Sequence, residues 1–241
     1  MDIAPEPRTN HLLAVLPQAG WQRWQPQLEP LHLPLGQVLH ESGGGLSHVY
    51  FPTTAIVSLQ YLVQDGASAE IAVVGSEGLI GIALFMGGNT TPNRAIVESA
   101  GEAYRLSATA IRSEFRQSTP VTHLLLRYTQ ALITQMAQTA VCNRHHSIDQ
   151  QLCRWLLMRL DRLHGRDMAV TQELIASMLG VRRERVSEAA SRLQRDGLIR
   201  YARGHLTVLE RAGIEQRTCE CYGVVEREYH RLLPDVMARR T

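Results

Sequence analysis

A short segment between residues 182 and 188 concentrates side chains that can recognise the edges of nucleic-acid bases. Arginine can donate two parallel hydrogen bonds to O6 and N7 of guanine, and glutamate can accept one from the amino group of cytosine. The same composition also suits the solvated face of an ordinary helix, so the surrounding elements decide between the two interpretations. The segment contains Arg182, Arg183, Glu184, Arg185, Ser187 and Glu188.

The residues around this segment predict two helices joined by a tight turn and followed by a two-stranded wing. Thr171 is a good N-cap for a helix over 172–179, and Gly180 suits the left-handed turn that ends it. A second helix is predicted from 182 to about 195, and two short strands follow between 198 and 209. This arrangement favours base recognition over a merely solvated face. The inner side of the second helix consists of Val186, Ala189, Ala190 and Leu193.

Residues 170–208 resemble the winged helix-turn-helix of the Crp/Fnr regulators, and the order of elements ahead of them is similar as well. The resemblance covers residues 30 to 210. It implies a bacterial transcription regulator that binds a palindromic site in double-stranded promoter DNA as a homodimer, through the helix at 182–195. RNA polymerase is an implied partner if the protein activates transcription. In the wing, Arg203 is expected to contact a phosphate.

The resemblance also assigns roles by position. Arg183, Glu184 and Glu188 fall where the family's main base contacts lie, and the neighbouring charged residues complete the base-reading surface. Thr171 and Gln172 fall at the family's phosphate-contacting helix cap. Glu188 departs from the pattern, because the best-known member has a second arginine there. The preferred half-site is therefore expected to differ.

The first half of the chain is rich in short strand-like runs separated by turn signals. Asp65-Gly66 is a good hairpin turn between the last two runs, and Asn10 can cap a short helix that precedes them. Regular spacing of this kind predicts an antiparallel barrel or jelly roll. The predicted strands cover 36–40, 48–52, 55–63 and 69–74.

The expected fold class is α+β: an N-terminal antiparallel β-barrel or jelly roll, similar to cyclic-nucleotide-binding domains, then a long helix and a winged helix-turn-helix. Ser147 and Gln150 form a capping-box pattern that starts a new helix after the long one. Helical spacing continues over 212–233 as a C-terminal tail. The expected domains are 1–118, 119–146 and 147–241.

Thr119-Pro120 opens the long helix, because Thr is a good N-cap and Pro is favoured at the first helical position. Its wide apolar band predicts packing on the β-strands and on a second copy of the chain. Burial within one chain remains an alternative. The dimer stripe predicted from 4-3-4-3 spacing consists of Val121, Leu125, Tyr128, Leu132 and Gln135.

The resemblance places an effector pocket at Gly81-Ile82 and Asn93-Arg94. In the cyclic-nucleotide readers of this superfamily a Gly-Glu pair grips the ribose, and an Arg-Ser pair holds the phosphate. Here the carboxylate is missing, and Arg94 is displaced by one residue, which turns it to the other face of a strand. The pattern argues against cyclic AMP, so the domain either senses another effector or is a scaffold.

A metal- or redox-responsive regulator using Cys142, His145 and His146 is an alternative. The iron–sulfur members of the superfamily use N-terminal cysteines, and no cysteine precedes Cys142 here, which argues against such a cluster. The capping box at Ser147 interrupts the helix next to these candidate ligands. Cys219 and Cys221 would point roughly 200° apart on a continuous helix, so no shared ion, and no metal cofactor, is expected.

Composition restricts the remaining function classes. The 44% apolar fraction and 20% charge suit a globular protein, and neither a membrane-spanning run nor a signal peptide is recognisable, so a cytoplasmic protein is expected. Residues 1–118 carry 6 Arg against 10 acidic residues, whereas 119–241 carry 19 against 13. This asymmetry indicates an anionic partner for the C-terminal half. A barrel enzyme with an accessory DNA-binding domain is the weakest alternative, since no catalytic constellation can be placed.

Overall fold

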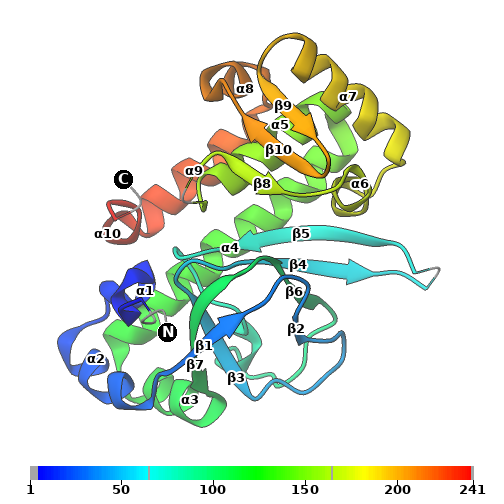
Figure 1. The fold of residues 1–241 in the computed structure, drawn as a ribbon. Coiled ribbons are helices and arrows are strands. Elements are labelled where there is room, and N and C mark those ends of the chain that lie inside the picture. Colours follow the sequence, from blue (N-terminus) through cyan, green and yellow to red (C-terminus); the bar gives the residue numbers. More distant parts are fainter. Residues whose placement is uncertain (1–4, 65, 164, 240–241) are drawn as a thin grey trace.

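The computed structural model describes residues 5–64, 66–163 and 165–239. The N-terminal strands pair antiparallel as two sheets, which together form what we call the β-domain (Figure 1). One sheet has the order β1-β7-β3, from β1 (Glu29–Leu33), β7 (Gly101–Ser107) and β3 (His48–Pro52). The other has the order β2-β6-β4-β5, from β2 (Val38–His40), β6 (Arg94–Ser99), β4 (Ile56–Leu62) and β5 (Ser68–Val74). The α+β class with an antiparallel N-terminal part is confirmed.

The hairpin of β4 and β5 forms where the sequence predicts it. The two strands pair antiparallel from Val57 opposite Val74 to Leu62 opposite Ser68. Asp65 of the predicted turn lies outside the described residues. The predicted strands correspond to β2, β3, β4 and β5. The sequence did not predict β1, β6 and β7, which are identified by their pairing in the sheets.

Short helices flank the sheets. Asn10 caps α1 as predicted, because its side-chain oxygen accepts the N–H of Leu13 at 3.1 Å. Its amide also donates to the carbonyl oxygens of Pro52 and Gly78, which attaches the N-terminal helices to the β-domain. These elements are η1 (Pro7–Thr9), α1 (His11–Ala14), α2 (Gln18–Trp24), η2 (Gln25–Gln27), η3 (Ile82–Leu84) and α3 (Ala108–Gln117).

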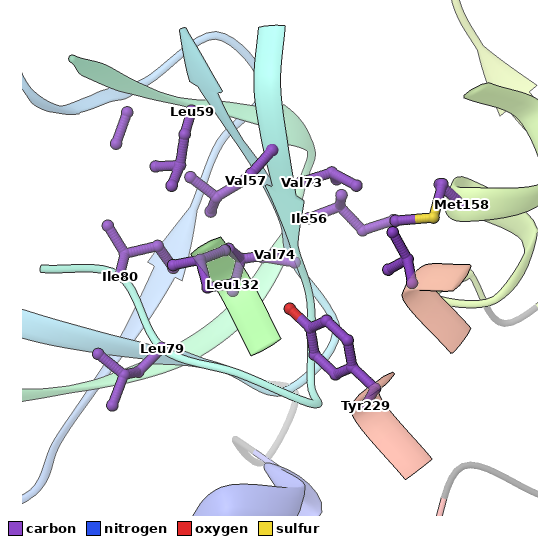
Figure 2. Packing of buried hydrophobic residues seen from close by; sticks show 14 of the residues in the cluster. Ile56, Val57, Leu59, Val73, Val74, Leu79, Ile80, Leu132, Met158 and Tyr229 are labelled. Carbon is purple, nitrogen blue, oxygen red and sulfur yellow. The ribbon is translucent and has the colours of Figure 1, made fainter. Parts of the chain in front are cut away.

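The long helix α4 (Thr119–His145) lies against β5 and against α9 (Glu220–Leu232) (Figure 1). Figure 2 shows Leu132 of α4 and Tyr229 of α9 beside apolar side chains of β4 and β5. Gln135 of α4 extends this contact with polar bonds, since its oxygen accepts the N–H of Val73 at 2.8 Å and its nitrogen donates to the Tyr229 hydroxyl. The helix is therefore part of the core of its own chain.

This packing corrects the predicted dimer stripe. The five predicted side chains are no more than 1% exposed and face the chain's own core, so they cannot meet a second copy. The exposed large apolar side chains of α4 are Leu126, Ile133 and Val141. The apolar band is wide enough to cover two faces, and the sequence does not tell which face the β-sheet takes. The buried five are Val121, Leu125, Tyr128, Leu132 and Gln135.

The C-terminal part begins with α5 (Ile148–Leu160), whose predicted capping box between Ser147 and Gln150 is present. A three-stranded sheet of order β8-β10-β9 accompanies the helices. No described helix has the length and hydropathy needed to cross a bilayer. The further elements are β8 (Asp167–Ala169), α6 (Gln172–Leu179), α7 (Arg183–Arg195), β9 (Ile199–Ala202), β10 (His205–Val208), α8 (Arg211–Arg217), α9 and α10 (Pro234–Met237).

Buried ion pairs join α5 and the residues directly after it to the β-domain. Arg159 bonds to Glu70 of β5 and, at 2.7 Å, to Glu98 of β6. One turn further along, Arg162 pairs with Glu77 at 2.7 Å, and both side chains are 2% exposed. Removing one partner of such a pair leaves an uncompensated buried charge, which is costly. These pairs therefore hold the C-terminal part in a defined position on the β-domain.

Candidate nucleic-acid interface

The turn between α6 and α7 follows from its capping residues. Thr171 caps α6, with its side-chain oxygen accepting the N–H of Leu174 at 3.1 Å. Gly180 ends the helix with φ 65°, in the left-handed region that a side chain disfavours. Val181 packs partly buried against the core after the turn. The predicted helix-turn-helix is present at the predicted residues.

The second helix, α7, divides into a buried and an exposed side. Its predicted inner residues are at most 3% exposed, which anchors the helix on the domain. Arg182 is its N-cap, so the charged segment occupies the first two turns. The exposed members of that segment are Arg182, Arg183, Glu184, Arg185 and Glu188. Guanidinium and carboxylate groups are thus presented together at one end of a helix.

Ser187 has a different environment from its charged neighbours. It is half-buried, and its hydroxyl donates a hydrogen bond to the side-chain oxygen of Gln172 at the start of α6. The bond connects a predicted base-contacting residue with a predicted phosphate-contacting one. It also ties the start of α7 to the start of α6.

The wing is a tight hairpin of β9 and β10. Its two-residue connection, Arg203-Gly204, has φ values of 52° and 78°. A two-residue hairpin turn of type I′ requires a positive φ at both of these positions. Arg203 is exposed at the tip. Tyr201 attaches the wing to the domain, since its hydroxyl donates to the carbonyl oxygen of Val170 at 2.8 Å. Partial burial raises the pKa of Tyr201, so the hydroxyl stays protonated as a donor at neutral pH.

Three residues of the exposed surface were not predicted. Ser191 and Arg195 lie on the same side of α7 as Glu184 and Glu188 and are exposed as well. Their spacing of three or four residues from those positions is the signal that could have identified them. Arg200 on β9 adds a further exposed cation beside the helix.

The predicted effector pocket corresponds to a cavity of about 340 Å³ between the β-domain and α4. Gly81, Ile82 and Asn93 line it, whereas Arg94 is not among the lining residues and pairs with Glu41 at 3.3 Å. His40 also lines the cavity and bonds to Asn93 at 3.0 Å, and burial lowers its pKa. Apart from these groups and Thr91, the described lining is mostly aliphatic, with neither a carboxylate nor a guanidinium.

The candidate metal ligands are rearranged relative to the prediction. Cys142 and His146 lie together with Cys219 and Cys221, whereas His145 is exposed outside this group. The helical stretch expected over 212–233 is interrupted, because Cys219 is the extended N-cap of α9, with φ −85° and ψ 167°. The thiols of Cys219 and Cys221 therefore converge, which corrects the expected 200° separation.

Hydrogen bonding and burial shift the pKa values of these thiols in different directions. The bond with Cys142, at a sulfur–sulfur distance of 3.5 Å, lowers the pKa of Cys219 to about 5. The same bond, together with burial, raises the pKa of Cys142. Burial also raises the pKa of Cys221, to about 11. The three sulfur atoms thus form one interacting group.

Comparisons with known proteins agree with this geometry. Residues 150–217 match the family model of the Crp-like helix-turn-helix domain. No curated protein matches the chain.

Several solved structures share the fold of most of the chain. A putative Crp/Fnr-family transcriptional regulator from Eubacterium rectale is 17% identical, with a TM-score of 0.67 over 87% of this chain and 98% of that one. A CRP-family transcriptional regulator from Thermus thermophilus is 20% identical, with a TM-score of 0.65 over 78% and 95%. The c-di-GMP-responsive global regulator CLP from Xanthomonas campestris is 16% identical, with a TM-score of 0.64 over 80% and 99%. At these identities the likeness shows the fold.

Proposed function

We propose that this chain, a DNA-binding transcriptional regulator of the Crp/Fnr type rather than an enzyme, reads a two-fold-related DNA site as a homodimer. The observation that carries the proposal is the exposed start of α7, where arginine and glutamate side chains stand together above a buried apolar side. A recognition helix places these turns against base edges in the major groove. The proposed base contacts are Arg182, Arg183, Glu184, Arg185, Ser187 and Glu188.

Backbone contacts would position the helix on the duplex. Thr171 and Gln172 lie at the start of α6, where helix N–H groups favour a phosphate. Arg203 at the wing tip supplies a cation near the start of α6, because the neighbouring Gly204 accepts a hydrogen bond from the N–H of Val170. These contacts carry no sequence information themselves, but they set the register in which α7 meets the bases.

The exposed side of α4 supports a dimer. Leu126, Ile133 and Val141 are the large apolar side chains on it, and Ala137 lies between the last two. Their spacing of seven, four and four residues keeps them on one helix face, as a two-helix seam requires. A second copy of α4 packed on this face would place two α7 helices symmetrically, which matches a palindromic site.

We assign residues 1–118 to an effector or scaffold domain, 119–146 to dimerisation and 147–241 to DNA binding. The aliphatic cavity of the β-domain suits a largely apolar effector better than a cyclic nucleotide, whose phosphate would need a cation. Because α4 lines the cavity, an occupant bears directly on the helix that joins the two halves. A promoter-binding protein acts in the cytoplasm, and RNA polymerase is the further partner of an activator.

Selection from a random pool of DNA duplexes by the purified, ligand-free protein tests the proposal. A dimeric reader enriches an inverted repeat whose half-site centres lie about one helical turn apart. A matched selection with the Glu184→Ala and Arg183→Ala double variant should lose the enrichment. Enrichment of the same repeat by both proteins would contradict base reading by α7.

A further inference from the structure

Four potential metal ligands converge where α4 ends and α9 begins. The ligand atoms of Cys142, His146, Cys219 and Cys221 all lie within 4.8 Å of one another, and the three cysteines are buried. Sγ of Cys142 lies 3.5 Å from Sγ of Cys219, and Sγ of Cys221 lies 3.6 Å from Nδ1 of His146. The DNA-binding surface uses none of these side chains.

The Cys142–Cys219 and Cys221–His146 distances match those between ligand atoms of a tetrahedral zinc ion. With Zn–S bonds of about 2.3 Å and a Zn–N bond of about 2.0 Å, the ligand atoms of a tetrahedron lie roughly 3.5–3.8 Å apart. Three thiolates and one imidazole are a common donor set for structural zinc, and soft sulfur ligands disfavour magnesium and calcium. A disulfide needs sulfur atoms about 2.05 Å apart, so it does not describe the arrangement seen.

The surroundings of His146 orient its ring for this role. Nε2 lies 3.3 Å from a carboxylate oxygen of Glu220, while Nδ1 faces the sulfur of Cys221. A proton on Nε2 donated to Glu220 leaves the lone pair of Nδ1 directed at the thiols. Such a carboxylate–histidine pair is the usual outer support of a zinc ligand.

Arg154 provides charge compensation. Zinc with three thiolates carries a net charge of −1, and the buried guanidinium of Arg154 lines the same small cavity as Cys142. One of its nitrogens donates to the hydroxyl of Thr139 at 2.9 Å, while Nε has no hydrogen-bond partner among the described residues. A buried cation beside the sulfur atoms fits an anionic metal centre.

We propose that Cys142, His146, Cys219 and Cys221 bind one Zn²⁺ per chain and thereby fix the junction between α4 and the DNA-binding domain. His146 is the C-cap of α4, one residue before the cap of α5, so the ion would join this junction to the start of α9. Zinc occupancy then sets how α7 is presented to DNA. This regulatory part rests on the proposed function, whereas the metal site does not.

Metal analysis of the purified full chain, kept reduced, tests the site. We expect one zinc per chain, and replacement by Co²⁺ should give thiolate-to-cobalt charge-transfer bands and the visible bands of a tetrahedral ion. Cys142→Ser, Cys219→Ser and His146→Gln should lose stoichiometric zinc while circular dichroism monitors folding. The matched controls are Cys153→Ser, which alters the fourth cysteine, and His145→Gln, which alters the exposed neighbour.

The outcomes separate clearly. Zinc retained in both controls and lost from the three ligand variants supports the site. No stoichiometric zinc in the wild-type protein, a cobalt spectrum without thiolate bands, or an oxidised Cys142–Cys219 pair as the only stable form would overturn it, irrespective of how any variant folds.

Coupling to DNA requires a second measurement. Removing zinc with a chelator should weaken binding to the selected duplex by roughly tenfold, and adding zinc should restore it. Unchanged affinity with zinc removed would overturn the regulatory part. If zinc binds as expected but no duplex is enriched, the proposed function fails and the metal site stands.

Discussion

Arg192 on α7 pairs with Asp149 in the first turn of α5 through nitrogen–oxygen contacts of 2.8 and 2.6 Å. The helix that we propose as the reader of DNA bases is thereby joined to the helix that follows α4. Both side chains are partly exposed, so the pair positions the helices more than it stabilises the fold. This contact connects the end of α4, through α5, to α7, so a displacement at the end of α4 acts on α7.

Arg183→Ala should weaken binding to the selected duplex by about 1–3 kcal/mol for each half-site, because one bidentate contact to a base is lost. Binding to a scrambled duplex of the same length should change little. Fluorescence anisotropy with both duplexes measures the difference, and Arg227→Ala, at an exposed site on α9, is the control. An equal loss of affinity for both duplexes would show that Arg183 does not contact a base.

Arg203→Asn should lower affinity evenly for specific and scrambled DNA. Asn tolerates the positive φ at this position, so the substitution removes the charge without straining the wing. The slope of log affinity against log salt should fall by about one for each subunit. A salt titration measures that slope, and an unchanged slope would place Arg203 away from the phosphates.

Ile133→Glu should dissociate the dimer and leave the chain folded. Ile133 is 51% exposed, so a carboxylate is tolerated in a monomer, but burying an unpaired carboxylate at a two-helix seam costs several kcal/mol per copy. Sedimentation over a range of concentrations measures the assembly. Val63→Glu, at an apolar residue that is 58% exposed on the β-domain, is the control. If the variant stays dimeric, the dimer interface does not include Ile133.

Glu98 should make stability depend on pH in an unusual direction. Burial raises its pKa above the ordinary 4.5, against the attraction of Arg159. A carboxyl with a raised folded pKa stabilises the fold below its unfolded pKa, and this contribution is lost as pH rises through the folded pKa. Urea unfolding should therefore show that the wild type loses stability relative to Glu98→Gln as pH rises from about 4.5. A relative gain would show that Arg159 lowers this pKa instead.

Local signals predicted the helix boundaries of the DNA-binding part well. Thr171, Gly180 and the Ser147–Gln150 capping box act within a few residues, and the structure has each of them in its predicted role. The face that α4 turns to the β-domain depends on contacts with β5 and α9 that are remote in sequence. Periodicity showed an apolar band on α4 but could not assign its two sides.

The cysteine cluster escaped prediction for a related reason. Helical spacing runs through Thr218 and Cys219 without an interrupting proline or glycine, yet the chain is extended there and a new helix starts. Cys142 and Cys219 are 77 residues apart, so only the packing of α9 on α4 brings them together. The exposed charged surface of α7, by contrast, could be predicted from the sequence, because it depends on a single helix and on the apolar residues of that helix's inner side.

The most direct test of base reading by a symmetric dimer is a random-duplex selection repeated with Glu188→Arg. Glu188 is exposed on α7, and arginine prefers guanine where glutamate accepts from cytosine. The preferred base should change at one position in each half-site, symmetrically, with the half-site spacing retained. An unchanged consensus, or a change in one half-site alone, would contradict the account.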